Sequence, residues 1–106
     1  MHTPDKWVIL EIESPDDKVR KILSSWYGGY AHGDSWRLSS GITEIEDKDD
    51  HYLIHNESGS IYQCFKESQG MNNFTASIFE EWLQKIPDNV RMEVVSITHL
   101  NQNYKD

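Results

Sequence analysis

The stretch of residues 36–66 alternates apolar and polar side chains in three short runs separated by turn residues. Runs of this length that are rich in β-branched and aromatic residues are typical of β-strands. They predict three consecutive antiparallel strands, at residues 36–45, 51–56 and 61–66. A two-residue turn at Ser58 and Gly59 is expected between the last two strands, because glycine accepts the positive φ of a tight hairpin.

This turn sets the expected register of the hairpin. The predicted cross-strand pairs are Tyr52 with Phe65, Leu53 with Cys64, Ile54 with Gln63, and His55 with Tyr62. Because successive side chains of a strand point to opposite faces, each face gathers alternate residues. One face is expected to carry Tyr52, Ile54, Ile61 and Phe65. The other is expected to carry Leu53, His55, Tyr62 and Cys64. We expect helices over one face, while the other stays open or is covered by a partner.

Further elements are expected on both sides of this meander. Residues 7–13 alternate like a strand, and Ser14 followed by Pro15 is typical of a helix start. The apolar residues that come next have the i, i+3, i+4, i+7 spacing of one helix face: Val19, Ile22, Leu23 and Trp26. A second helix is expected over residues 75–86, ended by Pro87, and a last strand over residues 91–97.

The predicted fold is therefore α+β, with the order β-α-β-β-β-α-β. Its five-stranded, mostly antiparallel sheet carries both helices on one face, which is the economical packing for these elements. Trp26 and Trp82 are expected in the core under the helices. The 106 residues suit a single domain, with residues 1–6 and 101–106 flexible.

The charge pattern argues against some classes of function. The net charge is −8, and residues 42–57 contain six acidic residues against one basic residue. Direct binding to nucleic acid or to an anionic membrane is not expected, because both need clustered Lys and Arg. The single cysteine cannot form an internal disulfide, and no signal peptide is recognisable. Both features favour a cytoplasmic location.

Metal and thiol chemistry are not expected. His51 and His55 have a spacing that binds zinc on a helix, but on a strand it separates the two imidazoles by about 13 Å, too far for one ion with bonds of about 2 Å. Cys64 is expected to face Leu53 across the hairpin, so it cannot complete a ligand set with His51. A Cys64–His55 pair is conceivable, but a small buried side chain is the simpler interpretation of Cys64. No cofactor is expected.

The loop of residues 27–34 is the place where an enzyme would have its site. His32 and Asp34 could act there as a base and the group that orients it. The alternative interpretation is a helix end followed by a polar loop. The glycines match neither the phosphate-binding nor the dinucleotide-binding pattern.

The leading hypothesis is a small acidic protein–protein interaction module without chemistry of its own. It could serve as an inhibitor, of the immunity, antitoxin or phage anti-defence type, of a basic nucleic-acid-handling protein. The expected partner-binding residues are Glu44, Glu46, Asp47, Asp49, Asp50, His55 and Tyr62. Acidic residues interleaved with aromatic ones complement a basic surface and speed association. The alternatives are a small enzyme or ligand-binding domain using the 27–34 loop, and a homodimeric subunit that associates through the open sheet face.

Overall fold

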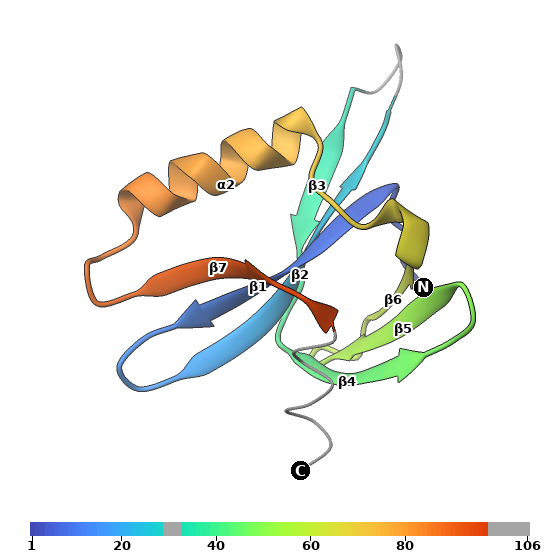
Figure 1. Cartoon of the computed structure of the whole chain (residues 1–106), viewed down its shortest axis with the longest axis horizontal. Helices are drawn as coiled ribbons and strands as arrows, with labels where there is room; N and C mark the ends of the chain where they lie inside the picture. The colour runs from blue at the N-terminus through green and yellow to red at the C-terminus, as the bar shows by residue number, and fades with distance from the viewer. Residues whose placement is uncertain (29–32, 98–106) are drawn as a thin grey trace.

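The computed structural model describes residues 1–28 and 33–97. Over these residues the chain forms two antiparallel sheets and one α-helix (Figure 1). The first sheet has the order β3-β2-β1-β7 and consists of β1 (Lys6–Glu13), β2 (Lys18–Trp26), β3 (Ser35–Leu38) and β7 (Arg91–Val95). The second has the order β4-β5-β6 and consists of β4 (Ile42–Asp47), β5 (His51–Asn56) and β6 (Ile61–Phe65). A 3-10 turn, η1 (Lys66–Ser68), leads to helix α2 (Asn73–Lys85).

The elements form three layers: the helix, the four-stranded sheet and the three-stranded sheet (Figure 1). One apolar cluster fills the space between the two sheets: Trp7, Ile9, Ile22, Ile42, Ile54, Tyr62, Cys64 and Ile97. A second cluster lies between the four-stranded sheet and α2, whose Phe79, Trp82 and Ile86 pack on it. The four-stranded sheet is therefore covered on both faces. The indole N–H of Trp7 ties the two sheets together by donating a 2.7 Å hydrogen bond to the Phe65 carbonyl.

The prediction of a mixed α+β fold with antiparallel pairing is confirmed, but the topology is not the predicted one. The structure has two sheets of four and three strands instead of one five-stranded sheet, and a single helix among the described residues. The two expected core tryptophans are both partly buried. Trp26 packs against the cluster between the sheets, and Trp82 packs against the cluster under the helix.

The expected first helix is strand β2, whose residues 18–25 pair with the whole of β1. Ser14 and Asp17 close the connecting turn by exchanging two backbone hydrogen bonds. The error has a physical cause. Because β2 is covered on both faces, its consecutive residues Ile22 and Leu23 are both buried, one in each apolar cluster. A strand that is buried on both sides loses its alternation and gives the same apolar spacing as a helix face.

The expected first strand of the meander is divided between the two sheets. Its beginning is β3, which pairs with β2, and its end is β4, which pairs with β5. The chain crosses at residues 39–41, where the Ser39 side chain accepts a hydrogen bond from the Ile22 N–H. Gly41 is buried there, and a Cβ at this position would come within 3.0 Å of the Glu57 side chain and 3.1 Å of the Val19 side chain. Glycine therefore suits this crossing, because a Cβ would require these neighbouring side chains to shift slightly.

The β5–β6 hairpin differs by one residue from the predicted register. Tyr52 pairs with Cys64 and Ile54 pairs with Tyr62. The loop has three residues instead of two, residues 57–59, and Gly59 takes φ +90° at its end. Glycine in this conformation after a turn is typical of three-residue hairpins. Since a shift by one residue moves a strand's side chains to the opposite face, the predicted grouping of side chains on this hairpin is wrong.

The second predicted helix is confirmed as α2. The Asn72 side chain caps it by accepting a 2.8 Å hydrogen bond from the Thr75 N–H, so the helix begins at Asn73, two residues earlier than expected. Its last residue is Lys85, shortly before Pro87. Within the described part of the chain, no helix has the length and apolar character needed to cross a bilayer.

The N-terminal residues, expected to be flexible, are hydrogen-bonded to the second sheet. His2 forms a parallel bridge with Tyr62, in which the His2 N–H donates to the Ile61 carbonyl and the His2 carbonyl accepts from the Gln63 N–H. The His2 ring lies on the Tyr62 ring, with centroids 4.8 Å apart. The other segment that was expected to be flexible, residues 101–106, lies outside the described residues.

Candidate functional site

The face of the three-stranded sheet that points away from the four-stranded sheet is the candidate site, and we call it the outer face. Cross-strand partners point to the same side of a sheet, so the observed register defines its members. They are Glu44 and Glu46 from β4, His51, Leu53 and His55 from β5, and Ile61, Gln63 and Phe65 from β6. The opposite face holds Ile45, Tyr52, Ile54, Tyr62 and Cys64, which belong to the core between the sheets or pack against it.

Three apolar side chains form the centre of the outer face. Leu53 pairs with Gln63, which places it diagonally between Ile61 and Phe65 on the neighbouring strand. All three are partly exposed, and neither apolar cluster includes any of them. We refer to Leu53, Ile61 and Phe65 as the apolar trio. The outer face therefore has a small, partly exposed apolar centre, where the Phe65 ring also contacts the His51 ring with centroids 5.6 Å apart.

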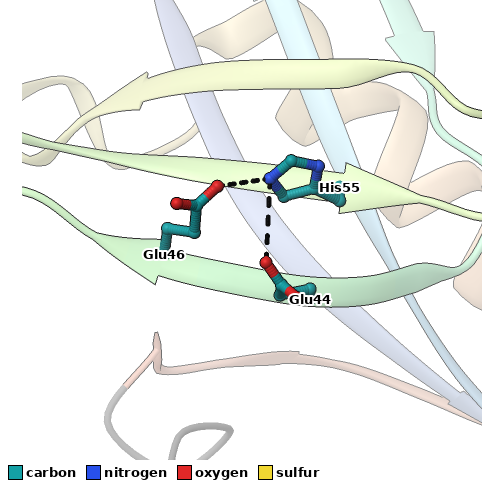
Figure 2. Close-up of side chains that lie close together, drawn as sticks. All are labelled: Glu44, Glu46 and His55. Carbon is teal, nitrogen blue, oxygen red and sulfur yellow. Dashed lines mark hydrogen bonds and ion pairs between the residues drawn. The ribbon is translucent and has the colours of Figure 1, made fainter.

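Beside the apolar trio, the edge strand β4 contributes two carboxylates that converge on a histidine (Figure 2). Glu44 pairs directly with His55, and Glu46 follows two residues later on the same side of the strand. His55 Nε2 lies 2.5 Å from Glu46 Oε2 and 4.0 Å from Glu44 Oε2. The hydrogen bond with His55, followed by that with Lys48, lowers the pKa of the Glu46 carboxyl. The three side chains remain partly exposed, with Glu44 at 66%, Glu46 at 36% and His55 at 31%.

The remaining acidic residues lie at the turn between β4 and β5, and we call Asp47, Asp49 and Asp50 the acidic turn. Asp47 Oδ1 lies 2.7 Å from Lys66 Nζ, and this hydrogen bond raises the pKa of Lys66. Asp50 Oδ1 lies 2.6 Å from His51 Nδ1, and this hydrogen bond lowers the pKa of the Asp50 carboxyl. Asp49 is exposed and forms no ion pair with another described residue. The turn is therefore acidic but partly neutralised by its own neighbours.

The structure brings most of the predicted partner-binding residues together. Glu44, Glu46 and His55 share the outer face, and the acidic turn adjoins it. Tyr62 is the exception, because the observed register turns it into the core, where only 1% of its surface is exposed. The expectation that Tyr62 lies with Leu53 and His55 on an open face is wrong. Ile61 and Phe65 take its place, and a correct hairpin loop length would have identified them.

Cys64 is not placed for nucleophilic chemistry. It is fully buried in the core between the sheets, and this burial raises the pKa of its thiol to about 12. A thiol with such a pKa stays protonated, whereas attack requires the thiolate. His55 points to the outer face, so the conceivable Cys64–His55 pair is not formed.

The predicted pair of His32 and Asp34 cannot be placed as a pair, because His32 lies outside the described residues. Asp34 is exposed just before β3. Near it, an open hollow of about 360 Å³ is lined by Met1, His2, Thr3, Trp26, Ser35, Trp36 and Arg37. Arg37 Nη1 lies 3.4 Å from His2 Nε2 in this lining. Burial and the neighbouring Arg37 charge both lower the pKa of His2.

No family model matches this chain, and searches of curated proteins and of solved structures return no match. The distinguishing feature of the site is the partly exposed apolar trio flanked by the carboxylates of β4.

Proposed function

We propose that this chain is a small acidic protein–protein interaction module that binds a basic protein through the outer face and the acidic turn. The observation that carries the proposal is the apolar trio, which is partly exposed, belongs to neither core cluster and lies beside the carboxylates of β4. Contiguous exposed apolar surface rimmed by polar residues is typical of interaction sites.

The two parts of this surface would have different roles. Burial of Leu53, Ile61 and Phe65 against a partner would supply affinity, because the hydrophobic effect scales with the apolar area removed from water. The exposed carboxylates would attract a basic surface and set its orientation, which raises the association rate and the specificity. A net charge of −8 strengthens this attraction. An inhibitor of a basic nucleic-acid-handling protein, of the immunity, antitoxin or anti-defence type, combines these properties.

The test begins with affinity capture from the native lysate and identification of the captured protein by mass spectrometry. Binding of that purified protein is then measured by surface plasmon resonance with Leu53→Ser and Phe65→Ser. We expect each variant to weaken binding by at least about tenfold, as for residues at the centre of an interface. Val94→Ser is the matched control, because Val94 is an apolar residue of the other sheet that is 43% exposed; it should leave the affinity unchanged. An acidic captured protein, or equal affinities for all variants, would refute the proposal.

Association of two copies through the same face is the competing hypothesis, since the apolar trio would also be buried in a homodimer. Light scattering coupled to size-exclusion chromatography distinguishes a homodimer from a monomer that binds a foreign partner. If the parent protein is a dimer and Phe65→Ser is a monomer, self-association is favoured. If the parent and the variant are both monomers, the result supports a foreign partner. The further alternative, a small enzyme using the 27–34 loop, depends in part on residues 29–32, which are not described.

A further inference from the structure

Three potential metal ligands converge on the outer face (Figure 2). One ligand atom from each of Glu44, Glu46 and His55 lies within 4.8 Å of the other two. Their arrangement follows from the sheet. The two glutamates are spaced by two residues on β4 and so point to the same side, while His55 is the direct cross-strand partner of Glu44. The backbone thus holds the three side chains together without a flexible loop.

We propose that Glu44, Glu46 and His55 form a binding site for a divalent transition-metal ion of the zinc type. Zinc binds imidazole nitrogen and carboxylate oxygen at about 2.0–2.2 Å. Tetrahedral ligands at that distance are separated from one another by about 3.5 Å. The observed separations run from 2.5 Å, between His55 Nε2 and Glu46 Oε2, up to 4.8 Å. Side-chain rotation would open the shortest one and close the longest, since all three side chains are partly exposed. Three protein ligands leave a fourth position for water or for a group from a partner.

The donor set selects the class of ion. An imidazole nitrogen suits zinc, copper, nickel and iron, whereas calcium and magnesium prefer sites made of oxygen alone. His55 Nε2 already faces both carboxylates, and Glu46 uses the oxygen nearest to it, Oε2. The other oxygen of Glu46, Oε1, lies 3.4 Å from Lys48 Nζ. That ammonium group opposes the metal electrostatically, but it does not occupy the oxygen that faces His55.

This site does not conflict with the geometric argument against a shared ion between His51 and His55. His51 is not part of the cluster and has a carboxylate partner of its own, Asp50, at 2.6 Å. The outer face therefore offers His51 as an internal control for His55. His51 is a histidine of the same strand and face with one acidic neighbour, whereas His55 has two.

The probe is Zn²⁺ alone, titrated into the full chain by calorimetry at neutral pH in a buffer that does not chelate metal. We expect one equivalent to bind to the parent protein. Glu46→Gln and His55→Gln should each weaken binding by at least about tenfold, because even the loss of a supporting outer-shell group weakens metal sites by 10- to 100-fold. His51→Gln is the control and should change the affinity by less than about threefold. Circular dichroism checks that each variant is folded.

A second measurement needs no variant. In imidazole nitrogen spectra of the parent protein, Zn²⁺ should shift the His55 Nε2 resonance and leave His51 unaffected. The proposal is overturned if Zn²⁺ does not bind below about 1 mM, a range in which many weak metal sites already bind. It is also overturned if the shifted resonance belongs to another histidine, or if Glu46→Gln and His55→Gln bind Zn²⁺ as tightly as the parent.

Discussion

Trp36 on β3 and Trp82 on α2 meet edge to face, with ring centroids 5.4 Å apart and planes inclined by 71°. This is the geometry that the quadrupoles of aromatic rings favour. β3 is an edge strand of the four-stranded sheet, so the contact joins the helix to the rim of the layer that it covers. Trp82 also packs on the apolar cluster between α2 and this sheet. Trp82 therefore anchors the helix both to the rim and to the covered face of this sheet.

Trp82→Ala should lower the free energy of unfolding by about 2–3 kcal/mol, somewhat less than for a fully buried tryptophan because Trp82 is partly exposed. Leu83→Ala is the control. Leu83 is the next residue of the same helix and is 38% exposed, so its loss should cost less than about 1 kcal/mol. Urea unfolding measures both. Equal costs for the two variants would mean that Trp82 does not anchor the helix.

The edge-to-face contact itself can be isolated by a double-mutant cycle with Trp36→Ala and Trp82→Ala. We expect a coupling of about 0.5–1.5 kcal/mol between the two rings, the range measured for aromatic pairs. Additive effects of the two substitutions, within the error of the unfolding measurement, would show that the rings do not stabilise each other.

The buried thiol gives a prediction about reactivity and pH. Because burial holds the pKa of Cys64 at about 12, a thiol reagent at pH 8 should not label the folded protein, whereas it should label the chain in urea. The stability should also fall as the pH rises above the ordinary thiol value of 9.0 towards 12. Over that interval the unfolded chain loses the proton and the folded chain keeps it, so the free energy of unfolding decreases by about 1.4 kcal/mol per pH unit from this group. Cys64→Ala should remove this part of the slope, and rapid native labelling would contradict the burial.

The sequence predicts some elements of this fold well, and the errors have common physical causes. Helix α2 was predictable because its apolar stripe and Pro87 are local signals, although its start at Asn73, after the Asn72 cap, was placed two residues too late. Strand β2 was not, because a strand that is covered on both faces has the same buried spacing as a helix. Whether such a segment is covered on both faces depends on residues far away in the chain, which no local pattern contains.

The site shows the same limit on a smaller scale. The sequence identifies the acidic residues and His55 as candidates, and it places them near one another. Which side chains lie on the outer face, however, depends on whether the hairpin loop has two residues or three. The loop length decides whether Tyr62 or Ile61 faces outward. The convergence of Glu44, Glu46 and His55 likewise depends on the β4–β5 register. This register was not predicted, because β3 and β4 were expected to form one continuous strand.

The acidic turn tests the proposed function most directly. Asp49 has no ion-pair partner among the described residues, so Asp49→Lys should change the free energy of unfolding by less than about 0.5 kcal/mol. Asp47→Lys should lower the melting temperature more, because it removes the partner of Lys66 and places two ammonium groups together. If the turn contacts a basic partner, the double variant that combines Asp47→Lys with Asp49→Lys should associate with it more slowly at low salt. The salt dependence of the affinity should also become weaker.

The control for this experiment must carry the same change in net charge at a different place. Asp16→Lys with Asp88→Lys meets this requirement, because both residues are exposed and neither belongs to the three-stranded sheet. If binding depends on local complementarity at the acidic turn, Asp47→Lys with Asp49→Lys should reduce the association rate clearly more than the control pair. Equal reductions would mean that only the overall charge of −8 matters. Unchanged binding of both double variants across a salt series would exclude electrostatic attraction, and the apolar trio would then have to account for binding by itself.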